Sequence, residues 1–134
     1  MTRRGTWYTF DSTFSKIYWD ATNLIVEKIS YDITLVQNLI INYSYNSTAE
    51  KYVMTRYDGL QSEIQLFDGV YKDTSFVFHN VNVNYGDTTL AKTYSQINIF
   101  NIDKDSFNVE MSVSRDKGET WSPRQRLFYV RKLD

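Results

Sequence analysis

The sequence predicts an all-β fold, specifically an antiparallel up-and-down β-barrel of eight to ten strands. Aromatic residues make up 16% of the chain, and such side chains fit a pleated, half-buried surface. Apolar residues alternate with a period of two rather than following the 3.6-residue period of a helix. Turn residues recur about every 8–12 positions, which is typical of a sandwich or barrel. Hairpin order throughout favours the barrel, because closure removes exposed sheet edges.

The strands follow from this alternation. In the stretch FNVEMSVS, Phe107, Val109 and Met111 are expected on one face and the polar residues between them on the other. Turn residues separate this strand, 106–114, from the other expected strands, which lie near 6–10, 15–20, 24–31, 38–45, 51–57, 62–71, 75–83, 92–102 and 124–132. The connections are too short for parallel crossovers, so neighbours should pair antiparallel. Residues 32–39 could form a short helix, although their β-branched side chains favour a strand.

Length and composition exclude several classes of protein. The chain of 134 residues has the size of one domain, so we expect a single β-barrel domain over 1–134. Its net charge of −1 argues against a nucleic-acid-binding protein, which usually has a basic face. No stretch has the roughly 20 apolar residues of a membrane-spanning helix, and the N-terminus lacks the apolar run of a signal peptide. With no cysteine, a cytoplasmic location is expected.

The stretch SRDKGETW, 114–121, carries a recognisable turn pattern. It resembles the Asp-box, a hairpin turn of sialidase-type propellers, with its characteristic residues at Ser114, Asp116, Gly118, Thr120 and Trp121. The Asp116 side chain can accept backbone N–H groups within the turn, and Gly118 can adopt a positive φ. The pattern occurs once, and the chain is too short for a propeller. We therefore expect a structural hairpin without a bound metal.

Two further stretches carry a family resemblance. GTW, ending at Trp7, resembles the first strand of lipocalins and fatty-acid-binding proteins, the calycin group, and YVRK places Arg131 on the last strand. The resemblance implies that Arg131 packs across Trp7 through a cation–π contact. Residues 50–132 also resemble a group of uncharacterised bacterial lipocalin-like proteins, most specifically over 106–131. That resemblance implies a small antiparallel barrel without an assigned role.

Candidate ligand-binding residues are few. Arg56 lies among tyrosines and is a reasonable anchor for an anion, although a salt bridge on the barrel surface is the favoured alternative. His79 is the single histidine, which together with the lack of cysteine excludes a His- or Cys-based zinc site. Nitrobindin-like haem binding through His79 is disfavoured because residues 8–10 depart from that family's pattern, so no cofactor is expected. Tyr94 and Glu110 complete the candidate pocket.

Three functions remain open. The first is a binding protein for a small apolar or amphipathic ligand, with Arg56, His79 or Tyr94 as the polar anchor. The second is an interaction protein with a filled barrel that acts as a homodimer. The third, an enzyme using Glu110 or His79 as acid or base, is the least favoured. Other strand carboxylates, Glu63 and Asp68, are expected on the solvated outer face.

Overall fold

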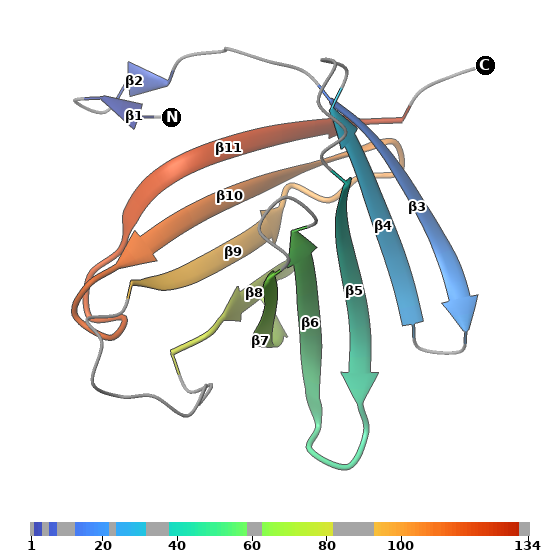
Figure 1. The fold of residues 1–134 in the computed structure, drawn as a ribbon, viewed down its shortest axis with the longest axis horizontal. Helices are drawn as coiled ribbons and strands as arrows, with labels where there is room; N and C mark the ends of the chain where they lie inside the picture. The colour runs from blue at the N-terminus through green and yellow to red at the C-terminus, as the bar shows by residue number, and fades with distance from the viewer. Residues whose placement is uncertain are drawn as a thin grey trace. The chain divides into compact units, whose positions relative to one another are not determined.

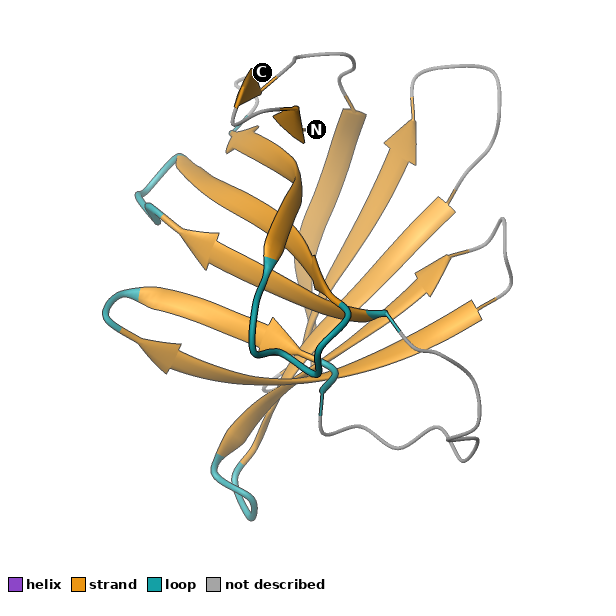
Figure 2. Cartoon of the chain, turned by 90° about the vertical axis from the view of Figure 1, so that its left-hand side faces the viewer, coloured by secondary structure: helices purple, strands orange, loops and turns teal. Residues whose placement is uncertain are grey.

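The computed structural model describes residues 2–3, 6–7, 13–21, 24–31, 38–58, 63–81 and 93–131, which form strands and loops (Figure 2). The chain divides into two compact units, one of Phe10–Asp68 and one of Met1–Thr9 with Gly69–Asp134. Each unit is described by itself. The expectation of a single domain over 1–134 stays a prediction. Within the described residues, no helix has the length and hydropathy needed to cross a membrane.

The described strands form one large sheet and one small one. The small sheet pairs β1 (Thr2–Arg3) with β2 (Thr6–Trp7). The large sheet has nine strands in sequence order (Figure 1): β3 (Thr13–Ala21), β4 (Leu24–Tyr31), β5 (Asn38–Asn46), β6 (Lys51–Asp58), β7 (Glu63–Lys72), β8 (Ser75–His79), β9 (Tyr94–Phe100), β10 (Ser106–Ser114) and β11 (Ser122–Val130).

This architecture confirms the predicted fold class. The described chain is all-β, neighbours in sequence are neighbours in the sheet, and the nine strands lie within the predicted eight to ten. The order is that of an up-and-down sheet, consistent with a lipocalin-like barrel.

Strand ends differ from the predictions in a few places. Strand β8 ends at His79 rather than at residue 83. Strand β11 begins at Ser122 and includes Pro123, which is tolerated because β11 is the last strand in the sheet order and a proline near the start of such a strand removes no essential ladder bond. Of the possible helix at 32–39, residues 32–37 lie outside the described part of the chain, and 38–39 belong to β5.

In the unit of Phe10–Asp68, the register of β3 to β6 separates two faces. Cross-strand partners share a face, and the pairs Glu27–Ile41 and Ile41–Arg56 define one that we call the Glu27 face. Its members with described side chains are Ser15, Ile17, Trp19, Ile25, Glu27, Ile29, Leu39, Ile41, Tyr43, Tyr45, Tyr52, Met54 and Arg56. Most of the buried apolar side chains of this unit belong to it, so this face carries the unit's core.

In the other unit, β8 to β11 also have one apolar face. Phe78, Ile97 and Val109 are buried and lie side by side on it, and we call it the Phe78 face. Aromatic rings extend it: Phe76 stacks at 6.3 Å from Phe78, and the Phe107 and Tyr129 rings stack at 4.4 Å. The alternation expected for 106–114 therefore places Val109 in the core and its polar neighbours on the opposite face.

Gly69 and Phe78 form a tight contact in this core. A β-carbon on Gly69 would lie 2.3 Å from the nearest atom of the Phe78 ring, which is closer than any real contact. The ring therefore occupies the space that a side chain at position 69 would need, and the two residues should be energetically coupled.

We predict that Gly69→Ala destabilises the protein by about 1–3 kcal/mol through overpacking. The same substitution should be much less harmful in a Phe78→Ala background, because the clashing ring is gone. Urea unfolding of the four proteins of this cycle measures the coupling. Val70→Ala, at an exposed neighbour, serves as a control with a change below about 0.5 kcal/mol. If Gly69→Ala lowers the free energy of unfolding equally in wild type and in Phe78→Ala, the described packing of Gly69 against Phe78 is contradicted.

Candidate functional site

A carboxyl group is buried on the Glu27 face. Glu27 is 2% exposed and is surrounded on the sheet by aliphatic side chains. Two hydroxyl groups hold it: Ser15 Oγ donates to Oε2 at 2.9 Å, and Tyr43 Oη donates to Oε1 at 3.0 Å. Because Ser15, Glu27 and Tyr43 come from β3, β4 and β5, the cluster depends on the pairing of all three strands.

Arg56 lies on the same face. In the register, Glu27 pairs with Ile41 and Ile41 pairs with Arg56, so one strand separates Glu27 from Arg56. Two strand spacings of the sheet place their backbones roughly 9.5 Å apart. Arg56 Nη1 donates to Gln65 Oε1 at 3.3 Å, and within the described side chains Arg56 forms no ion pair. A half-buried guanidinium thus has a neutral amide as its hydrogen-bond partner on this face.

The position of Glu27 is not the one that stability alone favours. Removing a polar group from water is unfavourable, and hydrogen bonds only offset that loss. The neighbours Ile25 and Ile29 on the same strand face show that an aliphatic residue fits this environment. A buried carboxyl with an arginine two strands away is therefore a candidate functional site, which we call the Glu27–Arg56 site.

The other predicted pocket residues lie in the second unit. His79, Tyr94 and Glu110 share the face of β8 to β10 opposite the Phe78 face, because His79 pairs with Gln96 and Glu110 pairs with Asn98. Arg56 belongs instead to the unit of Phe10–Asp68. The combined four-residue pocket stays a prediction.

Glu110 is engaged by a cross-strand arginine. Arg126, its partner in the β10–β11 register, donates to Glu110 Oε2 from Nε at 3.2 Å and from Nη2 at 2.5 Å. The guanidinium also lies 5.8 Å from the centre of the Phe100 ring. Strand β9 separates Glu110 from His79, roughly 9.5 Å across the sheet, which is too far for direct proton transfer between the two side chains.

His79 and Asn98 have unsatisfied atoms. His79 Nδ1 and Asn98 Oδ1 are buried without a hydrogen-bond partner, and they lie on neighbouring strands of one face. Orphaned buried atoms of this kind are uncommon in folded proteins. This face therefore has unused hydrogen-bonding capacity, although its described residues contain no group of side chains able to hold a metal ion.

The hairpin at 114–121 is organised by Ser114, which is 2% exposed. Its hydroxyl accepts from the N–H groups of Asp116 and Gly118 and donates to Asp116 Oδ1 at 2.6 Å, so its hydrogen-bonding capacity is fully used. Asp116 also accepts the backbone N–H of Thr120 at 2.9 Å and its hydroxyl at 2.5 Å. These contacts leave Asp116 a structural residue of the turn.

Gly118 and Trp121 complete the hairpin. Gly118 has φ +88°, a conformation that side chains disfavour, and a β-carbon there would lie 3.3 Å from the Trp121 ring. The preceding Lys117 also has a positive φ, of 58°. The indole thus lies against the glycine and covers one side of the turn.

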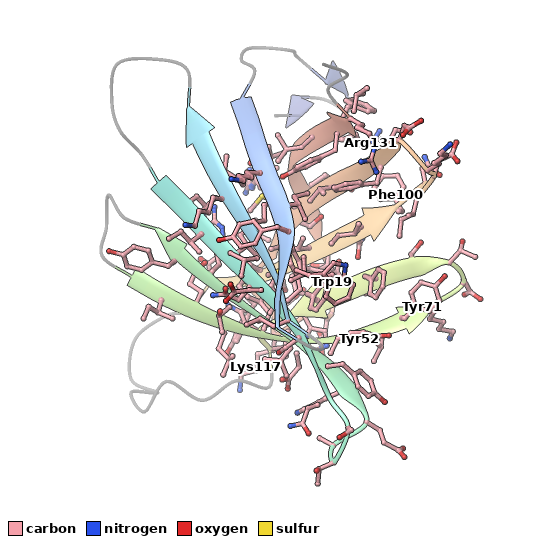
Figure 3. All side chains as sticks on the ribbon, turned by 90° about the vertical axis from the view of Figure 1, so that its right-hand side faces the viewer. Trp19, Tyr52, Tyr71, Phe100, Lys117 and Arg131 are labelled. Carbon is pink, nitrogen blue, oxygen red and sulfur yellow. The ribbon has the colours of Figure 1, made fainter. Side chains whose placement is uncertain are left out.

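The predicted contact between Trp7 and Arg131 involves the side chain of Trp7, which lies outside the described part of the chain. Arg131, at the end of β11 (Figure 3), donates from Nε to Asp105 Oδ1 at 2.9 Å and from Nη2 to the carbonyl of Lys104 at 3.3 Å. These bonds tie β11 to the turn before β10.

Asp68 is the other candidate carboxylate with a described side chain. It forms an ion pair of 3.1 Å with Lys51, and both groups are partly exposed. The side chain of Glu63 lies outside the described part of the chain.

Comparisons with known proteins identified no relative. No family model, no curated protein and no solved structure matches this chain. The functional conclusions below therefore depend on its own residues.

The Glu27–Tyr43 cluster generates a stability prediction. Tyr43→Phe removes one donor from the buried carboxyl and should destabilise the protein by about 1–3 kcal/mol. Replacing both partners, in Glu27→Leu with Tyr43→Phe, removes the polar group altogether, so this protein should be at least as stable as wild type. Urea unfolding measures the free energy of unfolding of the single and the double variant. If the double variant is less stable than wild type, the carboxyl is a stabilising element, and the functional interpretation is wrong.

The hairpin generates a pH prediction. Hydrogen bonds from Ser114 and Thr120 lower the pKa of Asp116 from 3.8 to about 2. A lowered pKa in the folded state means that the ionised carboxylate adds stability above pH 3.8 and that this contribution disappears as the pH falls toward about 2. The melting temperature of wild type should exceed that of Asp116→Asn by a constant amount at neutral pH.

That difference in melting temperature should then shrink in the acidic window, as followed by circular dichroism. Other carboxyl groups titrate in both proteins and cancel in the comparison. A difference in melting temperature that does not change with pH would contradict the lowered pKa of Asp116.

Proposed function

We propose that this protein binds a small amphipathic molecule with an anionic end, held on the Glu27 face. The observation that carries the proposal is the presence of Arg56 and a buried carboxyl cluster on a face that is otherwise apolar. The proposal includes the lipocalin-like character and the cytoplasmic location expected from the sequence.

The apolar part of the ligand would lie against aliphatic side chains. Ile25 and Ile41 flank Glu27 on the neighbouring positions of β4 and β5, and Ile17 on β3 extends the same surface. Ile17 is 45% exposed and is available to a ligand. Burial of apolar surface would supply most of the binding free energy, at about 25 cal/mol per Å².

The anionic part of the ligand would be bound by Arg56. A guanidinium stays charged at every physiological pH and binds a carboxylate through two parallel hydrogen bonds. Its bond to Gln65 leaves other N–H groups of the fork able to donate, since the guanidinium has five. Glu27 would select against a second anionic group and favour a hydroxyl group near the middle of the ligand, because carboxyl oxygens accept hydrogen bonds.

We predict a clear preference for an anion among ligands of equal chain length. Decanoate should bind at least about tenfold more tightly than decanol or decyltrimethylammonium, because hydrogen bonds to a charged group contribute about 1.5–3 kcal/mol. Isothermal titration calorimetry below the micelle concentration measures this. Arg56→Gln should weaken decanoate binding by about tenfold to hundredfold and leave decanol binding unchanged.

The matched control is Arg124→Gln, at an exposed position of β11, which should not change decanoate binding. Equal affinity for the three probes, no binding of any of them, or wild-type affinity in Arg56→Gln would each refute the proposal.

A further inference from the structure

Strand β3 has hydrogen-bonding groups available along one side. In the described part of the chain it pairs with β4 and is the last strand in the sheet order. Every second residue of such a strand directs its N–H and C=O away from the neighbouring strand. An unpaired edge of this kind is a template for a further strand.

Two side chains of β3 favour association at this edge. Trp19 is 70% exposed and Ile17 is 45% exposed, although both are large and apolar (Figure 3 labels Trp19). They lie on one face, and Lys16 and Tyr18 lie on the other, where the Lys16 ammonium is 5.9 Å from the centre of the Tyr18 ring. The strand has no proline. Two exposed apolar residues on an unpaired strand favour association.

We propose that β3 pairs antiparallel with β3 of a second copy of this chain, in the register centred on Tyr18. The molecular two-fold axis then passes between the two Tyr18 residues. This register places Lys16 opposite Asp20 of the other copy and Ile17 opposite Trp19, and each pair occurs twice because the interface is isologous.

Charge complementarity selects this register over its neighbours. Moving the centre to Ile17 pairs Lys16 with Tyr18, and moving it between Ile17 and Tyr18 pairs Lys16 with Trp19; neither places opposite charges together. In the Tyr18 register, two opposite-charge pairs and two apolar pairs lie across the strands, and such pairs stabilise sheets whereas like charges destabilise them. Both charged side chains are exposed and are able to reach across.

The β-bulge at the end of β3 is compatible with the pairing. The register with β4 shifts between Trp19 and Ala21, so Asp20 is the extra residue of the bulge. Asp20 is therefore less constrained by β4, and the long Lys16 side chain of the other copy spans the remaining gap. The bulge interrupts the regular pairing with β4 after Trp19, and the contact with the second copy is therefore limited to the few residues around Tyr18.

Sedimentation equilibrium on the full chain at low salt tests the proposal. Wild type should dimerise. The dissociation constant of the dimer should rise with salt concentration, because salt screens exposed charges and the Lys16–Asp20 pairs are exposed. Lys16→Asp and Asp20→Lys should each raise the dissociation constant by about tenfold or more, because each variant places two like-charge pairs in the interface. Lys72→Asp, an exposed change of the same charge on β7, is the control and should leave the constant unchanged.

The decisive experiment mixes the Lys16→Asp variant with the Asp20→Lys variant. In the Tyr18 register, a Lys16→Asp chain next to an Asp20→Lys chain has opposite charges at both pairs, so the mixture should form heterodimers about as tightly as wild type. The double variant, Lys16→Asp with Asp20→Lys, should also recover dimerisation. Circular dichroism confirms folding of each variant. A monomeric wild type, or a mixture that dimerises no better than its components, would overturn the proposal.

Discussion

The register of β3 to β6 is the constraint on which the candidate site depends. Side chains of a strand alternate with a period of two, so a slip by one residue would move every member of the Glu27 face to the other side of the sheet. The observed pairs instead align Glu27, Ile41 and Arg56 in one row across three strands. The sequence separates Glu27 and Arg56 by 29 positions (56 − 27), and only the sheet makes them neighbours.

A buried carboxyl and a half-buried guanidinium make the Glu27 face chemically different from an ordinary core. The hydroxyl groups of Ser15 and Tyr43 compensate part of the unfavourable burial of Glu27. An apolar residue would avoid the problem entirely, as its neighbours Ile25 and Ile29 do. A buried carboxyl at this position is consistent with a binding role. A few well-placed polar groups within an apolar surface set the orientation of a ligand.

Most of the fold could be predicted from the sequence because strand and turn preferences are local. Alternation at 106–114 and turn residues between the strands place β4, β5, β6 and β10 close to their observed bounds. The ends of strands were less predictable where the pairing with another strand sets them. The start of β11, which includes Pro123, is an example. Arg56 was a candidate anion anchor because of its aromatic neighbours, and the structure adds its position on the same face as the Glu27 cluster.

Glu27 was missed, although a signal exists. In LIVEKISY it occupies the phase of Ile25 and Ile29, so alternation alone assigns it to an apolar face. Ser114 was assigned to the structural turn, but the hydrogen bonds of its hydroxyl were not predicted, because the motif pattern explains only the aspartate and the glycine. The distance between His79 and Glu110 could not be predicted, because it requires the pairing of β8, β9 and β10.

The most direct measurement is the set of intermolecular nuclear Overhauser effects between unlabelled decanoate and protein carrying labelled isoleucine and valine methyl groups. Our account predicts contacts from the decanoate chain to Ile17, Ile25 and Ile41, on the Glu27 face. Contacts confined to Val26 and Val53, which lie on the opposite face of the same strands, would contradict it.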